Sequence, residues 1–411
     1  MFTKADALKL DAADMLKHKR AEFSIPEGMI YLDGNSLGVL PKAAVARVKH
    51  AVDVEWGVGL ITSWNKHGWF QKPLVIGNKI ARLIGAPKDS VIVADSISIN
   101  MFKVLSAALA KNPSRKIILS DSGNFPSDLY VAQGLSGFMN DGHALRVVEP
   151  EAVLDAITEG VAVVMLTETD YRSARRHDMK AVTDKAHAMG AYVIWDLAHS
   201  AGAVPGRLEE VNADFAVGCT YKYLNGGPGS PAFAYVHPRL QNEVMPALVG
   251  WWGHAAPFAF AQNYEPAPGI IRMQCGTQPI LSMQALDAAM DVWTDVEMMD
   301  VYAKAQKMCA LFVELSEARC GAHGVQLYGA RDFNKRGSHV SLRHEQSYAV
   351  VQALISKRVI GDFRAPDMMR FGFAPLYNSY ADVWDAVEAL REVLDKKLWD
   401  VPQFRERKAV T

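Results

Sequence analysis

Residues 191–199 read Ala-Tyr-Val-Ile-Trp-Asp-Leu-Ala-His, and residues 213–229 read Ala-Asp-Phe-Ala-Val-Gly-Cys-Thr-Tyr-Lys-Tyr-Leu-Asn-Gly-Gly-Pro-Gly. Each stretch opens with a short apolar run typical of a buried β-strand and ends in polar residues. The first run is followed by Asp196 and His199, and the second by Tyr221 and Lys222. Because open α/β sheets bind ligands beyond the carboxyl ends of their strands, these four side chains are predicted to share one site.

An aspartate and a lysine placed in this way suit pyridoxal 5'-phosphate. A carboxylate near the pyridine nitrogen keeps the ring protonated and electron-withdrawing, and a lysine amine forms a Schiff base with the aldehyde. Alone, Asp196 is typical of a turn and Lys222 of a solvated surface, but their co-occurrence favours a cofactor site. The glycine-rich end of the second stretch leaves space for a bulky ligand. It lacks the Gly-Lys-Ser/Thr ending of a nucleotide-binding phosphate loop.

Bulk properties narrow the class of protein. The chain has 411 residues and a formal net charge of −1. Its length predicts a large domain with a smaller one, and its balanced charge argues against nucleic acid or an acidic membrane surface as the main partner. A charged N-terminal segment and the lack of a long apolar run predict a cytoplasmic protein without a membrane span. Four cysteines without a Cys-x-x-Cys pair fit a reducing compartment.

Strand-like and helix-like segments alternate along the chain, which predicts βα units and a mostly parallel sheet. Predicted strands of the large domain lie at residues 90–94, 116–119, 161–166, 191–195 and 214–217, with helices at 101–111, 152–159 and 181–189. Later elements are a long helical region after residue 283, a strand at 338–342 and helices at 347–357 and 380–398. We predict an N-terminal segment (1–50) that packs with the small domain, a large cofactor-binding domain (51–299) and a small α+β domain (300–411).

Two further segments carry groups that a phosphorylated cofactor needs. Residues 91–101 read Val-Ile-Val-Ala-Asp-Ser-Ile-Ser-Ile-Asn-Met, a strand followed by a hydroxyl-rich turn and a helix start. Free backbone N–H groups at a helix start bind anions, so this segment is predicted to hold the phosphate; the alternative is that Ser96 or Ser98 only caps the helix. Phe125 follows another strand and is placed to stack on a pyridine ring. Asp128 nearby is equally suited to cap a helix.

With these pieces together, the sequence resembles the kynureninases, a family in the class V aminotransferase branch of fold-type I pyridoxal-phosphate enzymes. Its first motif is Tyr-Leu-Asp-Gly-Asn-Ser-Leu-Gly at residues 31–38, and its last is Arg-Phe-Gly-Phe-Ala-Pro-Leu-Tyr-Asn-Ser at 370–379. Between them lie matching segments at 64–69, 125–128, 196–199, 220–229, 250–254, 276–279 and 336–340. The lysine segment alone specifies only the superfamily, whereas its combination with the first and last motifs points to this family.

The resemblance implies a fold-type I architecture and a role for each matching residue. It implies that Lys222 forms the Schiff base, that Asp196 pairs with the pyridine nitrogen and that Phe125 stacks on the ring. Tyr221 is expected to reach the phosphate and to transfer protons with a pKa shifted toward neutral. Arg370 is expected to hold the substrate α-carboxylate. The other matching cofactor-contacting positions are Ile97, Ser98, Pro126, Ser127, Asp128, Thr167 and His199.

Four more positions match residues that the family places around the substrate and at its subunit interface. Ser36 and Trp64 fall where the family lines the aryl pocket, although a packing role is as well suited to Trp64. Trp251 and Thr277 match residues that come from the neighbouring subunit, so the resemblance implies a homodimer with active sites at the interface.

The activity implied by the resemblance is hydrolysis of the Cβ–Cγ bond of L-kynurenine, and possibly of 3-hydroxykynurenine, in tryptophan catabolism. The products are anthranilate, or 3-hydroxyanthranilate, and L-alanine. One alternative is another class V enzyme, a cysteine desulfurase or an aminotransferase. A desulfurase needs a mobile catalytic cysteine, whereas Cys309 and Cys320 lie in a segment predicted to be helical. The other alternative is a catalytically silent binding module with this fold, although Lys222, Asp196 and Arg370 are all present.

No metal site is expected from the sequence. Asp196 and His199 are a possible pair of ligands, but no further ligands follow at matching spacing.

Overall fold

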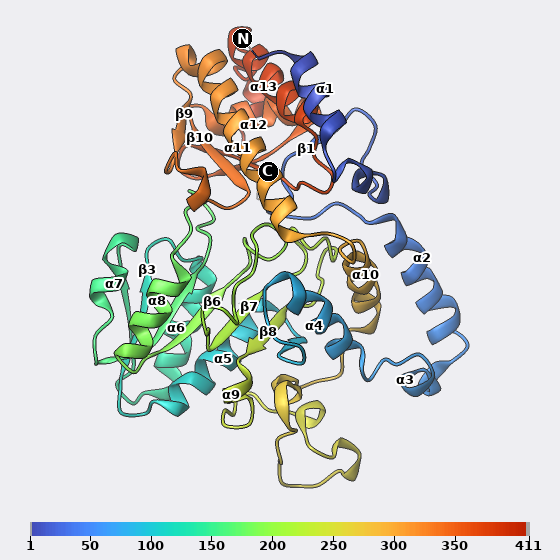
Figure 1. The fold of residues 1–411 in the computed structure, drawn as a ribbon, viewed down its shortest axis with the longest axis vertical. Coiled ribbons are helices and arrows are strands. Elements are labelled where there is room, and N and C mark those ends of the chain that lie inside the picture. Colours follow the sequence, from blue (N-terminus) through green and yellow to red (C-terminus); the bar gives the residue numbers. More distant parts are fainter. Residues whose placement is uncertain (1, 408–411) are drawn as a thin grey trace.

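A seven-stranded sheet forms the centre of the larger part of the molecule in this computed structural model, which describes residues 2–407 (Figure 1). The strands lie in the order β2-β8-β7-β6-β5-β3-β4. Their bounds are β2 Val91–Val93, β3 Ile117–Asp121, β4 Ala144–Val148, β5 Val161–Thr167, β6 Tyr192–Asp196, β7 Phe215–Gly218 and β8 Phe233–Val236. Strands β7, β6, β5, β3 and β4 run parallel, whereas β8 is antiparallel to β7 and β2. The predicted mostly parallel sheet is confirmed.

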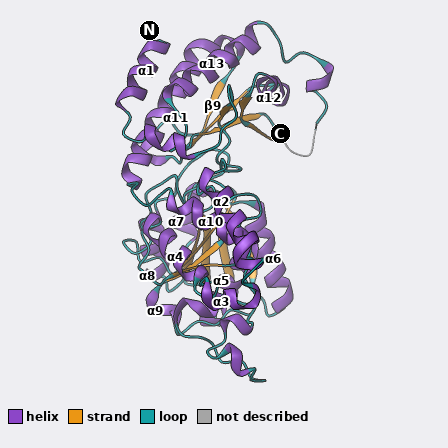
Figure 2. Cartoon of the chain, turned by 90° about the vertical axis from the view of Figure 1, so that its right-hand side faces the viewer, coloured by secondary structure: helices purple, strands orange, loops and turns teal. Residues whose placement is uncertain are grey.

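Helices cover both faces of this sheet, and Figure 2 shows the strands enclosed between them. The helices of the larger part are α2 Lys42–His50, α3 Ser63–Lys66, α4 Lys72–Leu83, α5 Ile97–Lys111, α6 Pro126–Met139, α7 Val153–Ala156, α8 Met179–Ala188, α9 Pro238–Gln241 and α10 Ile280–Asp291. In β5, Val163 and Met165 pack with α5 and α6, whereas Val164 and Leu166 pack on the opposite face with α4, α8 and α10. Each fully buried side chain of this kind stabilises the fold by about 1.5–3 kcal/mol.

The five predicted strands of this sheet are confirmed, but β4 and β8 were not predicted. Strand β4 reads Ala-Leu-Arg-Val-Val at the sheet edge and is largely exposed, so it lacks the continuous apolar pattern of a central strand. Strand β8 is short and lies between two prolines, Pro231 and Pro238. The helix predicted at 152–159 is also shorter, because the chain turns extended at Ile157 to bury that side chain.

A four-stranded antiparallel sheet in the order β12-β13-β10-β9 forms the smaller part, at the top of Figure 1. Its strands are β9 Gln326–Tyr328, β10 His339–Arg343, β12 Asp362–Arg364 and β13 Met368–Gly372. Its helices are α11 Met298–Cys320, α12 Ser347–Ser356 and α13 Tyr380–Asp395. Phe312 of α11 stacks on Phe371 of β13 with ring centroids 4.9 Å apart, which fixes the helix on the sheet. The predicted α+β character of this part is confirmed.

The N-terminal residues contact both parts. Helix α1 (Lys4–Ala13) lies against α13, where Lys4 pairs with Asp385 at 2.8 Å, and β1 (Ile30–Tyr31) pairs with β11 (Val359–Ile360). Helix α2 instead lies along α10, where Arg47 pairs with Asp287 at 2.8 Å. The division at residues 50 and 299 stays a prediction. Among residues 2–407, no helix combines the length and the hydropathy that crossing a bilayer requires.

Candidate active site

A cavity of about 300 Å³ opens beyond the carboxyl ends of β6 and β7. Asp196 is the last residue of β6, and the loop after β7 carries Tyr221 and Lys222. Eleven of the predicted site residues line this one cavity: Ser36, Ile97, Ser98, Phe125, Ser127, Asp128, Asp196, His199, Tyr221, Lys222 and Arg370. Side chains from six segments of the chain therefore meet where the sheet topology predicts a ligand site.

Lys222 is held by a buried histidine. Its Nζ lies 3.0 Å from Nε2 of His199. Burial lowers the pKa of His199 well below its ordinary value, and the nearby charge of Lys222 lowers it further. The imidazole is therefore neutral and accepts a hydrogen bond from the lysine through Nε2. This contact orients the amine and adds no second positive charge beside it.

Two buried carboxyl groups lie together on the other side of the cavity. Burial raises the pKa of Asp128 well above its ordinary value, and the charge of Asp196 raises it further. Burial also raises the pKa of Asp196, but Lys222 and the backbone N–H of Ala198, 2.8 Å from Oδ1, lower it. Asp128 is therefore the protonated member of the pair, and Asp196 carries the negative charge.

The remaining walls supply an aromatic face and a helix start. The Phe125 ring is partly exposed, and Lys222 Nζ lies 5.9 Å from its centroid. Ile97 and Ser98 occupy the first turn of α5, and Ser96 caps that helix by accepting from the Ile99 N–H at 3.4 Å. Ser96 therefore caps the helix, whereas Ser98 lines the cavity at the helix start.

These groups fit pyridoxal phosphate. Lys222 would hold the carbonyl carbon of the cofactor, Asp196 its ring nitrogen, Phe125 its ring face and the start of α5 its phosphate. Two buried polar atoms of the cavity walls, His199 Nδ1 and Asp128 Oδ2, have no hydrogen-bond partner within residues 2–407. Since buried polar atoms are normally paired, a polar ligand in the cavity fits this arrangement.

Arg370 belongs to a charged cluster at the mouth of the cavity. The buried guanidinium donates from Nε to Asp362 at 2.9 Å, from Nη1 to the carbonyl of Tyr171 at 2.7 Å and from Nη2 to Ser36 Oγ at 2.9 Å. Arg364, two residues after Asp362 on β12, pairs with the same carboxylate at 2.6 Å. Asp362 therefore holds two guanidinium groups that both line the cavity.

The carboxyl group of Asp33 lies beside this cluster. Burial and, to a smaller extent, the charge of Asp362 raise its pKa from 3.8 to about 7, although Arg370 opposes the shift. Between these two pH values the folded chain keeps a proton that the unfolded chain loses, so ionisation favours unfolding. We expect the unfolding free energy of Asp33→Asn, relative to the native chain, to increase from pH 4 to pH 7 and then stay level. Urea unfolding at several pH values measures this difference.

The matched control for Asp33→Asn is Asp155→Asn, which removes an exposed carboxylate and the same net charge. A stability difference that stays level for Asp33→Asn over the whole pH range would contradict the raised pKa.

Five predicted site residues do not line the cavity. Pro126 opens α6, and Thr167 ends β5 with its Oγ1 3.4 Å from the carbonyl of Asp196. Trp64 packs on Trp69 and Trp252, with ring centroids 5.5 and 4.9 Å away. These contacts favour the packing role for Trp64 over a place in the aryl pocket. Trp251 and Thr277 also lie outside the cavity of their own chain.

Sequence reasoning missed four residues of the cavity wall: Asn35, Ala198, Cys219 and Arg364. Asn35 and Ala198 lie inside motifs that were recognised, next to residues that were predicted. Arg364 follows Asp362 at a spacing of two in a short strand, and this alternation was the available signal for a shared face. Its strand was not predicted, so the signal was not used.

Three of the four cysteines are unsuited to act as nucleophiles. Burial raises the pKa of Cys309 and of Cys320 to about 12, and both lie within α11. Cys219 lines the cavity, but burial raises its pKa as well. Thiols of this kind stay protonated near neutral pH and are inert.

Solved structures with the same architecture include cysteine desulfurases. The apo enzyme from Thermococcus onnurineus NA1 superposes with a TM-score of 0.78 over 92% of this chain and 98% of its own, at 18% identity. A cysteine desulfurase from Escherichia coli superposes with a TM-score of 0.75 over 96% of this chain and 99% of its own, at 18% identity. The fold and the residues of the cavity define a fold-type I pyridoxal-phosphate enzyme.

Sequence relatives specify the family. The kynureninase of Pseudomonas fluorescens is 50% identical over 100% of both chains, and that of Burkholderia mallei strain SAVP1 is 49% identical over 100% of both. Residues 301–390 match the model of the kynureninase C-terminal domain. The chain belongs to the kynureninase family.

Proposed function

We propose that this chain hydrolyses the Cβ–Cγ bond of L-kynurenine to anthranilate and L-alanine, as a pyridoxal-phosphate enzyme of tryptophan catabolism. The observation that carries the proposal is the full-length 50% identity to a kynureninase. Lys222, Asp196 and Arg370 support it because they line one cavity with the chemistry that an amino-acid substrate needs.

Product analysis tests this function. The cofactor-loaded protein is incubated separately with kynurenine, 3-hydroxykynurenine and cysteine, and the products are identified by mass spectrometry. We expect alanine together with anthranilate or 3-hydroxyanthranilate from the first two substrates. Alanine from cysteine without any anthranilate from kynurenine would instead identify a desulfurase. Binding of the cofactor without turnover of any substrate would identify a silent binding module.

We assign proton movement at the substrate Cα to Lys222. Pyridoxal phosphate bound in the cavity supplies an electron-withdrawing ring that stabilises negative charge beside the amino nitrogen. Lys222 lines the cavity, and its amine is oriented by neutral His199 at 3.0 Å. The charged carboxylate of Asp196 keeps a proton on a ring nitrogen placed against it.

Substrate orientation is assigned to the arginine cluster. The planar guanidinium of Arg370 recognises a carboxylate through two parallel hydrogen bonds, but in this chain two of its donors already contact Asp362. Arg364 lines the same cavity and is partly exposed. We propose that the positive charges of Arg370 and Arg364 together hold the α-carboxylate of the substrate.

Tyr221 is assigned the role of proton donor. Burial raises the pKa of its phenol, and the neighbouring thiol of Cys219 raises it further, so the phenol keeps its proton near neutral pH. This shift is opposite to the near-neutral pKa that the sequence suggested for a group exchanging protons. A protonated phenol at the cavity wall suits delivery of a proton to the substrate after bond cleavage.

We expect Tyr221→Phe to bind the cofactor as the native chain does and to turn over kynurenine about 10²–10³-fold more slowly, because only the donor proton is lost. Cofactor absorbance and steady-state kinetics measure the two effects. Tyr130→Phe, at an exposed position on α6, is the matched control. Near-native turnover of Tyr221→Phe would remove the phenol from proton transfer.

A homodimer is part of the proposal. Trp251 and Thr277 lie outside the cavity of their own chain, and the Trp251 side chain is 41% exposed. The apolar side chains of Val58, Ile61 and Phe260 are also exposed, and burying such side chains favours association with a second copy. We propose that this copy receives Trp251 and Thr277 at its cofactor cavity. The solution mass of the active enzyme tests the assembly, and an active monomer would refute it.

We also propose a cytoplasmic location. Its support is the four cysteines, none of which is paired in a disulfide among the described residues.

A further inference from the structure

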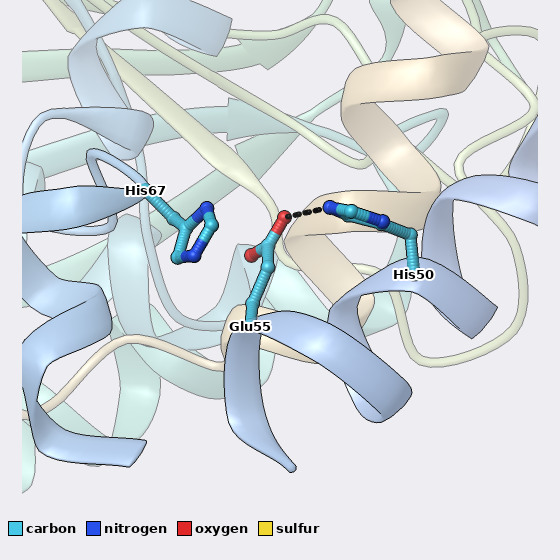
Figure 3. Close-up of side chains that lie close together, drawn as sticks. All are labelled: His50, Glu55 and His67. Carbon is cyan, nitrogen blue, oxygen red and sulfur yellow. Dashed lines mark ion pairs between the residues drawn. The ribbon is translucent and has the colours of Figure 1, made fainter. Parts of the chain in front are cut away.

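We propose that His50, Glu55 and His67 bind a divalent transition-metal ion of the Zn²⁺ type. Each residue offers one ligand atom, and the three atoms lie within 4.8 Å of one another. Figure 3 shows the Glu55 carboxylate between the two imidazole rings. None of the three residues lines the cofactor cavity, so this site is separate from the active site. It also departs from the expectation, drawn from the sequence, that the chain binds no metal.

Glu55 is a buried carboxylate with one oxygen fixed and the other directed at histidine. Its Oε2 accepts hydrogen bonds from Trp69 Nε1 at 2.6 Å and from Gln284 Nε2 at 2.7 Å. Its Oε1 lies 3.9 Å from His50 Nε2, beyond hydrogen-bond distance. A buried negative charge requires a cation nearby, and within residues 2–407 the ion-pair partner of Glu55 is this histidine. A metal ion between Oε1 and the imidazoles supplies that charge.

His67 provides an independent indication of a ligand. Its Nε2 is buried and has no hydrogen-bond partner among the described residues. The ring is turned toward the Glu55 carboxylate (Figure 3), and its centroid lies 6.4 Å from that of His50. A buried ring nitrogen without a partner is costly unless a ligand pairs with it.

The backbone around Glu55 has an irregularity that is frequent at functional sites. Residues Ala51–Trp56 form a π-helix that follows α2 directly. The wider turn of a π-helix changes the angular spacing of side chains relative to an α-helix, and such turns recur at binding sites. Here the turn places Glu55 inward, against Trp69 and Gln284, while His50 at the end of α2 stays 53% exposed.

The ligand set selects the metal. Two imidazoles and one carboxylate form a three-ligand set typical of Zn²⁺, with a fourth position left for water. Tetrahedral Zn²⁺ with bonds of about 2.1 Å holds its ligand atoms about 3.4 Å apart. The exposed His50 side chain can rotate to close the remaining gap. The hydrogen bonds from Trp69 and Gln284 supply the outer contacts that orient a carboxylate ligand.

Bound metal joins segments that support the proposed subunit interface. It ties the end of α2 to His67, and Trp69 beside it packs on Trp64. Trp64 packs on Trp252, which in turn contacts Trp251 with ring centroids 4.4 Å apart. We assign the ion a structural role in holding this aromatic cluster, and no part in the chemistry.

The test measures Zn²⁺ binding to the cofactor-loaded enzyme after dialysis against a chelator. Titration against a chromophoric zinc indicator gives affinity, and elemental analysis gives stoichiometry. We expect one Zn²⁺ per chain and a thermal midpoint that rises with zinc. His67→Gln and His50→Gln are each expected to weaken binding by at least about 10-fold. The matched control is His18→Gln, at an exposed histidine in the 3-10 helix Lys17–Glu22, which is expected to bind like the native chain.

Circular dichroism and cofactor absorbance show whether each variant is folded. If His67→Gln does not fold, His50→Gln decides the test, because its side chain is 53% exposed and its loss leaves the Glu55 hydrogen bonds intact. Zinc binding that is absent from the native chain, or equally strong in folded His50→Gln, would overturn the proposal. Activity enters neither readout, so a failure here is distinct from a failure of the proposed function.

Discussion

Lys222→Ala is expected to lower the turnover of kynurenine by at least about 10⁴-fold, the upper end of what a positioned proton-transfer group contributes. The variant loses both the covalent attachment of the cofactor and the group that moves the substrate proton. Mass spectrometry of borohydride-reduced peptides measures the lost attachment, because the cofactor mass on the peptide that contains residue 222 must disappear. Steady-state kinetics measures the lost turnover.

Lys185→Ala is the matched control, since Lys185 lies exposed on α8 outside the cavity. It is expected to keep native turnover and native labelling of the Lys222 peptide. Turnover of Lys222→Ala within about 10-fold of the native rate, or an unlabelled Lys222 in a fully loaded native enzyme, would contradict the assignment on which the mechanism depends.

Asp196→Asn is expected to lower kcat by about 10³-fold, because an amide cannot stabilise the positive charge of a protonated pyridine ring. The neighbouring Asp128→Asn is a sharp control, since the structure assigns the shared proton to Asp128 and its replacement removes no charge. Its effect on kcat is expected to stay within about 10-fold. Both variants keep the size of the side chain, so a difference between them reports charge rather than packing.

The pair of variants also has a spectroscopic readout. The cofactor absorbance of Asp196→Asn is expected to change its pH dependence, because ring protonation is lost, whereas that of Asp128→Asn is expected to follow the native chain. Equal losses of kcat in the two variants would place the negative charge on both carboxyl groups. A larger loss of kcat in Asp128→Asn would place the negative charge on Asp128 and contradict its assignment to Asp196.

The centre of the fold and most of the cavity wall could be predicted because their signals are local. Strands β6 and β7 begin as continuous apolar runs. Asp196 ends the first strand, and Lys222 lies in the loop shortly after the second. The parallel sheet then brings these loops to one edge without further information. Edge strand β4 escaped prediction because solvent on its exposed face removes the need for apolar residues there.

Contacts between distant segments could not be predicted from patterns. Asp362 joins Arg364 and Arg370, but the strand that carries it was not recognised in the sequence. The same limit applies to His50, Glu55 and His67, because a π-helix and a loop bring them together rather than a regular helical spacing. The pKa of Tyr221 was misjudged for a related reason, since its burial depends on the packing of the whole cavity wall.

Asp362, the carboxylate that Arg364 and Arg370 share, constrains how the substrate range of this enzyme can be changed. Redirecting it toward amines that lack an acid group means changing an interlocked trio, because replacing Asp362 alone leaves two neighbouring guanidinium groups without the carboxylate that they share. Laboratory evolution for such substrates should therefore explore the three positions as a single combinatorial unit.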